Sequence, residues 1–164
     1  MADRPYHVLF LCTGNSARSI LSEALLNSRG AGRFRAFSAG SHPTGRVNPF
    51  ALDKLRREGL PTAGLRSKSW DEFAAPGATP TDFIFTVCDN AAGESCPIWP
   101  GRPMTAHWGI PDPAGAQGTD DDRRRAFDEA FRLLERRIDR LVGLPIDRLD
   151  DAALARELVA IGQA

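Results

Sequence analysis

The sequence predicts an α/β fold in which four parallel strands form a sheet flanked by helices on both faces. Three observations lead to this prediction. Residues 6–11 form a short, continuously apolar run (YHVLFL), which is typical of a parallel strand buried on both sides. Further strand-like segments alternate with helical patterns along the chain. The length, 164 residues, suits a single domain.

The first half of the chain alternates strand and helix. After the first strand, a turn that contains glycine leads into a helical pattern with apolar residues on one face: Ala17, Leu21, Ala24 and Leu25. Residues 34–38 form the second predicted strand, closed by Ala39 and Gly40. A second helix begins at Pro49, since proline suits the first helical position, and ends near Glu58 before a glycine.

The second half of the chain supplies the other two strands and a long helix. Residues 82–87 (DFIFTV) and 104–108 are the predicted strands, and the segment between them is a loop rich in proline and glycine. A helix is predicted over residues 119–142, where apolar residues recur at steps of four and three: Phe127, Phe131, Leu134, Ile138 and Leu141. We assign residues 1–145 to one domain and residues 146–164 to a C-terminal helical extension or tail.

Composition excludes several classes of protein. Lys+Arg and Asp+Glu both number 21, so the formal net charge is zero, and we predict no nucleic-acid partner. The apolar run at residues 6–11 is too short for a signal peptide or a membrane span. The three cysteines are an odd, low number that argues against a disulfide framework. We therefore predict a cytoplasmic protein without a membrane role. The spacing of cysteine and histidine predicts no metal site.

The charge is unevenly distributed along the chain. Residues 1–60 contain nine basic and four acidic side chains, and 19 of the 21 basic residues are arginine. Arginine binds planar and tetrahedral oxyanions better than lysine does. The excess indicates an anionic ligand near the N-terminal half, although codon usage explains a high arginine content equally well.

The segment between the first strand and the first helix has the form Cys-x5-Arg, in the sequence CTGNSARS of residues 12–19. Ligands of doubly wound sheets bind at this edge. The five intervening residues can wrap backbone N–H groups around a tetrahedral anion at the positive end of the helix, and Arg18 adds a forked pair of donors. Cys12 at the floor of the loop would have a lowered pKa and form a thiolate. We predict that Cys12 is catalytic and that the anion is bound by Thr13, Gly14, Asn15, Ser16, Ala17, Arg18 and Ser19. The alternative is an inert cysteine in a tight turn.

Asp112 is the predicted general acid. It follows the fourth strand in the sequence WGIPDP, and a carboxyl group there can reach an anion held beyond the first strand. The alternative is an ordinary Asp-Pro turn.

Together with Ser38-Ala39-Gly40, the Cys12–Ser19 loop and Asp112-Pro113 resemble the low-molecular-weight protein tyrosine phosphatase superfamily over about residues 6–142. The resemblance implies a four-stranded parallel sheet with flanking helices and a phosphatase-like P-loop.

Two further cysteines, Cys88 and Cys96, point to redox chemistry. A phosphatase needs one thiolate, one arginine and one acid, whereas reduction of arsenate needs two electrons from two thiolates. With His107-Trp108-Gly109, this region resembles the thioredoxin-coupled arsenate reductases of the same superfamily. The resemblance implies reduction of arsenate to arsenite in arsenic detoxification, with Cys12 as the nucleophile and Cys88 and Cys96 as a relay that forms a redox-active disulfide.

The expected substrate is arsenate, with phosphate or sulfate as mimics. We expect no tightly bound cofactor and an external thiol reductant, either thioredoxin or glutaredoxin. Four residues resemble the potassium-binding set of some reductases: Asn15, Glu23, Ser38 and Asp71. We do not commit to this ion, because Asn15 and Ser38 can simply stiffen the loop and Glu23 is expected to be a solvated helix residue.

Two alternatives remain open. The first is a protein tyrosine phosphatase or small-phosphoester hydrolase that uses Cys12, Arg18 and Asp112, with the other two thiols protecting Cys12 from over-oxidation. The sequence Ala114-Gly115-Ala116 disfavours it, because phosphatases of this superfamily commonly place aromatic residues there. The second is a thiol redox sensor or an anion-binding module.

Overall fold

The computed structural model describes residues 5–87, 99 and 103–163. In this part of the chain, four strands form one parallel sheet in the order β2-β1-β3-β4. They are β1 (Tyr6–Leu11), β2 (Phe34–Ala39), β3 (Phe83–Thr86) and β4 (Met104–His107). The predicted fold class is confirmed, and each predicted strand differs from the observed one by no more than a residue at either end.

The register of the sheet places the ends of three strands side by side. Leu11, the last residue of β1, pairs with Ala39 of β2 and with Thr86 of β3. The carboxyl ends of these strands therefore share one edge, and the Cys12 loop begins at that edge.

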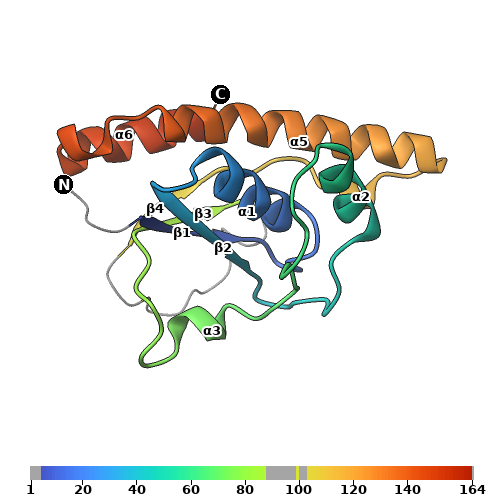
Figure 1. Ribbon diagram of the computed structural model, residues 1–164, viewed down its shortest axis with the longest axis horizontal. Helices are drawn as coiled ribbons and strands as arrows, with labels where there is room; N and C mark the ends of the chain where they lie inside the picture. Colours follow the sequence, from blue (N-terminus) through green and yellow to red (C-terminus); the bar gives the residue numbers. More distant parts are fainter. Residues whose placement is uncertain (1–4, 88–98, 100–102, 164) are drawn as a thin grey trace.

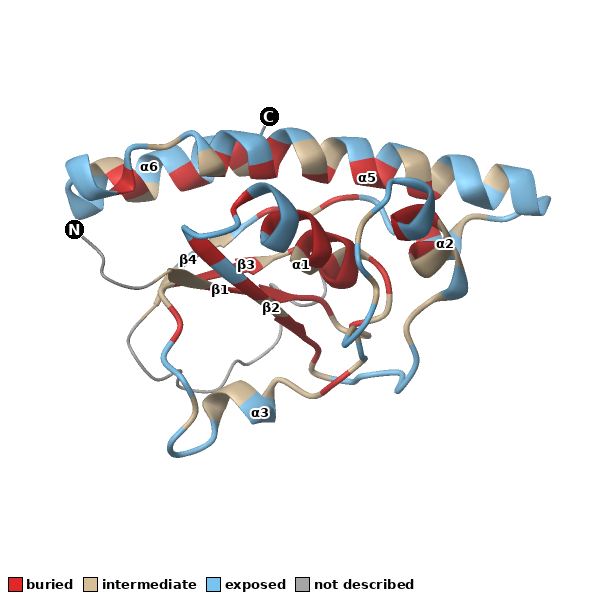
Figure 2. Cartoon of the chain, in the orientation of Figure 1, coloured by how far each residue is buried: buried red, intermediate tan, exposed pale blue. Residues whose placement is uncertain are grey.

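Four of the helices lie on one side of the sheet (Figure 1): α1 (Arg18–Arg29), α2 (Pro49–Arg57), α5 (Asp120–Val142) and α6 (Asp151–Gly162). The apolar face predicted for the long helix is the buried face of α5, visible as the buried patches along its lower side in Figure 2. Thr119 and Asp122 form a capping box that starts this helix. None of the helices in the described residues is both long enough and apolar enough to cross a membrane.

On the opposite side of the sheet, the described residues form much less secondary structure. The short helix α3 (Asp71–Ala74), which the sequence analysis missed, lies there (Figure 1). Trp70, Phe73 and Phe37 pack against a small cluster that includes Leu9 and Leu11 of β1. Helices therefore flank both faces as predicted, although the described residues place only a single turn of helix and a few aromatic rings on one of the two faces.

The C-terminal segment packs against the main core. After a 3-10 turn at Ile146–Arg148, the side chain of Asp150 caps α6. Leu158 is fully buried, and its carbonyl accepts a 2.9 Å hydrogen bond from Nε1 of Trp108. A Cβ atom at Gly162 would lie 2.4 Å from the carbonyl oxygen of His107, so only glycine permits this close approach. Helix α6 thus holds Trp108, which precedes the segment that leads to Asp112.

Replacing Leu158 by alanine is expected to lower the free energy of unfolding by about 3 kcal/mol, because it leaves a cavity under α6. The neighbouring residue Val159 is 47% exposed and provides the matched control. Val159→Ala is expected to change stability by no more than about 0.5 kcal/mol. Chemical denaturation of both variants measures the difference, and equal losses would contradict the packing role of α6.

Candidate active site

In the loop between β1 and α1, carbonyl groups accept hydrogen bonds from residues outside the loop, whereas several N–H groups are left to bind a ligand. Three carbonyl oxygens accept backbone hydrogen bonds of 2.9–3.0 Å, in the pairs His42–Thr13, Thr44–Gly14 and Asn48–Ser16 (donor first). In contrast, the N–H groups of residues 14–17 donate to no other group in the described part of the protein. This polarity fits an anion, because a row of free N–H groups forms a concave donor surface.

Helix α1 begins without a side-chain cap. Ala17 occupies the N-cap position and has no side chain that could accept a hydrogen bond. The helices α2, α5 and α6 are all capped by polar side chains, those of Asn48, Thr119 and Asp150. The N–H groups and the positive dipole end of α1 therefore remain available to an anion in the loop.

Asn15 fixes the turn of the loop. Its backbone is left-handed, with φ at 46°, and it is the single non-glycine residue with positive φ among those described. The side chain is fully buried, with Nδ2 donating to Oγ of Ser19 at 2.8 Å and Oδ1 accepting from the N–H of Lys68 at 2.9 Å. Asparagine tolerates this backbone because its side chain can satisfy local donors and acceptors.

Cys12 lies directly at the end of β1. It is 5% exposed, and its N–H donates to the carbonyl of Ala39 at 3.2 Å, which continues the β1–β2 ladder into the loop. Cys88 and Cys96 lie outside the described residues, so their predicted relay role stays a prediction.

Arg18 connects the loop to the segment after β4. Its NH1 donates to the carbonyl of Ile110 at 3.1 Å, and its NH2 lies 3.5 Å from Oδ2 of Asp112. Its Nε is buried and, within the described chain, has no hydrogen-bond partner. A buried guanidinium nitrogen without an acceptor is costly. An oxyanion bound in the loop is the kind of ligand that would supply the acceptor.

The structure places Asp112 beside Arg18, and its role as a general acid stays a prediction. Asp112 also starts the 3-10 turn Pro113–Gly115, and its Oδ1 accepts from the N–H of Ala114 at 3.0 Å. The Asp-Pro turn and the contact with Arg18 therefore coexist. About half of the side chain is exposed, so the carboxyl group has access to water.

Arg137 of α5 holds the start of this segment. Its NH1 donates to the carbonyls of Trp108 at 2.7 Å and Gly109 at 3.2 Å. The side chain is almost fully buried, and burial lowers the pKa of its guanidinium. The sequence does not predict this role, because one more arginine on a charged helix carries no signal of a buried backbone contact.

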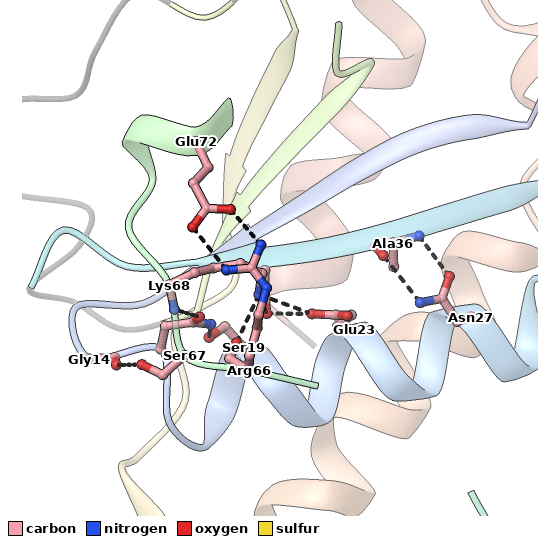
Figure 3. Close-up of polar contacts among 11 residues, drawn as sticks. Gly14, Ser19, Glu23, Asn27, Ala36, Arg66, Ser67, Lys68 and Glu72 are labelled. Atoms are coloured by element: carbon pink, nitrogen blue, oxygen red, sulfur yellow. Dashed lines mark hydrogen bonds and ion pairs between the residues drawn. The ribbon is translucent and has the colours of Figure 1, made fainter. Parts of the chain in front are cut away.

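Glu23 is not a solvated helix residue, and that expectation is wrong. Oγ of Ser38 donates to its Oε1 at 2.5 Å, and Nζ of Lys68 lies 3.8 Å from the same atom (Figure 3). Burial raises the pKa of Glu23 and lowers that of Lys68. The expectation failed because α1 packs against β2 at this point and the segment around Lys68 covers the carboxylate.

The residues present do not fit a potassium ion. The ammonium group of Lys68 already lies against Ser38 and Glu23, and a second cation there would be repelled. Asp71, the fourth member of the resemblance, is exposed at the start of α3. Among the described residues, no cluster of three histidine, cysteine, aspartate or glutamate side chains could hold a metal.

Comparisons with known proteins agree on one family. A family model described as low molecular weight phosphotyrosine protein phosphatase matches residues 7–159. The arsenate reductase of Bacillus licheniformis is 32% identical over 133 residues, which cover 81% of this chain and 92% of the relative.

Solved structures show the same likeness. The crystal structure of an arsenate reductase from Archaeoglobus fulgidus has 34% sequence identity and a TM-score of 0.63, over 84% of this chain and 99% of that chain. A low molecular weight protein tyrosine phosphatase from T. tengcongensis shares the fold, with a TM-score of 0.67 at 23% identity over 88% of this chain and 99% of that chain.

Proposed function

Since the chain belongs to the low molecular weight phosphotyrosine protein phosphatase family, we propose that it reduces arsenate to arsenite. The observation that carries the proposal is the loop between β1 and α1. Within the described chain, the N–H groups of residues 14–17 and Nε of Arg18 have no hydrogen-bond partner, and the loop begins at the buried thiol of Cys12. Curated relatives named arsenate reductase, at 32% and 35% identity over about four fifths of this chain, favour arsenate as the oxyanion.

Arsenate binds first. It is a tetrahedral oxyanion, so the N–H groups of residues 14–17 and the uncapped N-terminus of α1 suit its oxygens. Arg18 adds directed donors and, through its contacts with Ile110 and Asp112, keeps the acid close to the bound anion. Phosphate or sulfate would bind in the same way.

The first chemical step forms a bond between Sγ of Cys12 and arsenic. The thiolate attacks arsenic(V), and one oxygen leaves as water after taking a proton from Asp112. Arsenic remains pentavalent in this thioester-like adduct, so no electron has yet moved to it.

The second step moves two electrons. The thiolate of Cys88 attacks Sγ of Cys12, the S–As bond breaks, and its electron pair stays with arsenic, which leaves as arsenite. The Cys12–Cys88 disulfide is then attacked by Cys96, which frees Cys12 and yields a Cys88–Cys96 disulfide. An external dithiol, thioredoxin or glutaredoxin, supplies two electrons to reduce it. Cys88 and Cys96 lie outside the described residues, so this step rests on the sequence and the relatives.

Two observations favour reduction over phosphoester hydrolysis. The residues after Asp112 read Pro-Ala-Gly-Ala, which offers no aromatic ring to hold a phenyl group. In addition, hydrolysis uses a single thiol and leaves Cys88 and Cys96 without a part in the reaction.

The test supplies arsenate, NADPH, thioredoxin and thioredoxin reductase, and follows the oxidation of NADPH. We expect arsenate-dependent oxidation that disappears in Cys88→Ser and in Cys96→Ser separately, whereas phosphate in place of arsenate gives none. Glutaredoxin with glutathione replaces thioredoxin in a parallel assay.

Arsenite production that persists over many turnovers in Cys88→Ser would contradict the relay. Hydrolysis of para-nitrophenyl phosphate at enzymatic rates, without arsenate-dependent oxidation in either assay, would identify a phosphatase instead.

A further inference from the structure

The protein contains two lysines among its 21 basic residues, and both are buried: Lys54 is 6% exposed and Lys68 is 8% exposed. Lys54 is well compensated, because Nζ lies 3.0 Å from a carboxylate oxygen of Glu58 and of Asp128. Lys68 is different. It lies beside the oxyanion loop, and among the described residues the carboxylate within 4 Å of its Nζ is that of Glu23, at 3.8 Å. Burial of a weakly paired ammonium costs free energy, so its presence at this position calls for a structural explanation.

The backbone around Lys68 is bound to the loop. We call residues 66–69 the strap. The N–H of Lys68 donates to Oδ1 of Asn15 at 2.9 Å, and Oγ of Ser67 donates to the carbonyl of Gly14 at 3.1 Å (Figure 3). The carbonyl of Lys68 accepts from the N–H of Gly40 at 2.9 Å. The strap therefore bonds to the loop at two successive residues and to the chain just after β2.

The side chain of Lys68 joins the strap to two further elements. Its Nζ donates to the carbonyl of Arg66 at 2.9 Å, within the strap, and to Oγ of Ser38 on β2 at 3.4 Å. The same nitrogen lies 3.8 Å from Oε1 of Glu23 on α1, and Ser38 donates to that oxygen as well. One ammonium thus connects the strap, the sheet and the helix that begins at the loop.

The other charges around Lys68 are balanced. Arg66 is a like charge that acts on Lys68, and its two terminal nitrogens donate to the two carboxylate oxygens of Glu72 on α3 (Figure 3). Glu23 is therefore the group left to pair with Lys68. Burial lowers the pKa of Lys68 and raises that of Glu23, while the attraction between them acts in the opposite sense on both. Each charge depends on the other.

We propose that Lys68 is a positioning residue for oxyanion binding: its ammonium is a built-in cation that holds Ser38, Glu23 and the strap together behind the loop. The strap in turn holds Asn15 and Gly14 in the conformation that exposes the loop N–H groups. In the described structure, the Lys68 ammonium donates to Ser38 and Arg66 and not to the loop, which only the Lys68 backbone contacts. Because a lysine fills this place, oxyanion binding by this protein is independent of potassium. The inference rests on the proposed function only in taking the loop as an oxyanion site.

The test measures binding of inorganic phosphate by calorimetry, in tetramethylammonium chloride and in potassium chloride of equal ionic strength. Lys68→Met keeps most of the length and removes the charge. In tetramethylammonium chloride we expect its Kd to rise about tenfold. Potassium should recover part of the loss, because the ion can enter beside Ser38, Glu23 and the Arg66 carbonyl. The wild-type Kd should be equal in the two salts.

Lys54→Met is the matched control, since it removes a buried lysine from α2 and not from the strap. Its Kd for phosphate should equal that of the wild type, even if its stability falls. In steady-state assays, Lys68→Met should raise the KM for arsenate more than it lowers kcat, because it weakens binding of ground state and transition state alike.

A double variant, Lys68→Met with Glu23→Gln, leaves no unpaired carboxylate and keeps the test valid if the single variant does not fold. Its phosphate binding should stay weak, and potassium should no longer strengthen it. A wild-type Kd in either variant, a potassium response of the wild-type protein, or an equal loss in Lys54→Met would overturn the proposal. Phosphate binding involves no arsenic chemistry, so these results are independent of whether arsenate is reduced.

Discussion

Cys12→Ser is expected to abolish arsenate-dependent turnover, with kcat falling by about four orders of magnitude or more. A serine hydroxyl stays protonated at neutral pH, so it is a poor nucleophile at arsenic, and it cannot form the disulfide that releases arsenite. The buried position of Cys12 at the end of β1 leaves little room for water or another thiol to take over. Oxidation of NADPH by the coupled thioredoxin system measures the loss.

The same variant separates chemistry from binding. The N–H groups of residues 14–17 and the guanidinium of Arg18 remain in Cys12→Ser, so phosphate should bind with a Kd within a few-fold of the wild-type value. Turnover that continues in this variant would show that Cys12 is not the nucleophile. Loss of phosphate binding together with activity would indicate a collapsed loop.

Arg18→Lys is the second substitution for which we expect a large effect. Arg18 uses three nitrogens for three purposes: NH1 bonds to the Ile110 carbonyl, NH2 lies against Asp112, and Nε is left for the anion. Lysine keeps the positive charge, but its single ammonium nitrogen cannot fill all three positions at once. We expect kcat/KM for arsenate to fall by about three orders of magnitude, through weaker binding of the anion and a displaced acid.

Arg29→Lys is the control for this substitution. Arg29 ends the same helix and pairs with Glu135 and Asp139 on α5, away from the loop. Its replacement should leave kcat/KM unchanged, because exposed ion pairs contribute little even to stability. If Arg18→Lys retained the kcat/KM of the wild type, the assignment of Arg18 to the oxyanion site would be wrong.

The sheet and the long helix could be predicted because their signals are local. Residues 6–11 are mainly apolar and form a central strand, and its residues from Val8 to Leu11 are buried. The recurring apolar residues of α5 are buried from Phe127 to Leu141. Helix α3 has no comparable signal, since four residues cannot show a helical period, and its place depends on Trp70 and Phe73 meeting the sheet.

In the candidate site, too, some residues have a local signal in the sequence and others have none. The Cys-x5-Arg loop is contiguous, so its residue types and spacing already predict a concave anion site at the end of a strand. Arg137 and Lys68 gave no such signal. Lys68 stands in a run of polar residues that suits an exposed loop, and Lys68 itself is buried only because the run crosses the loop and the end of β2.

The sequence by itself determined the fold class and predicted the chemistry of the loop, because both depend on residues that are near neighbours along the chain. The tertiary structure decided which distant groups support that loop. The contact of Arg18 with Asp112, the bonds of Arg137 to the Trp108 segment and the pairing of Lys68 with Glu23 all join separate elements. Buried charges are compensated only when packing brings their partners within a few ångströms. No local pattern in the sequence predicts such contacts between distant residues.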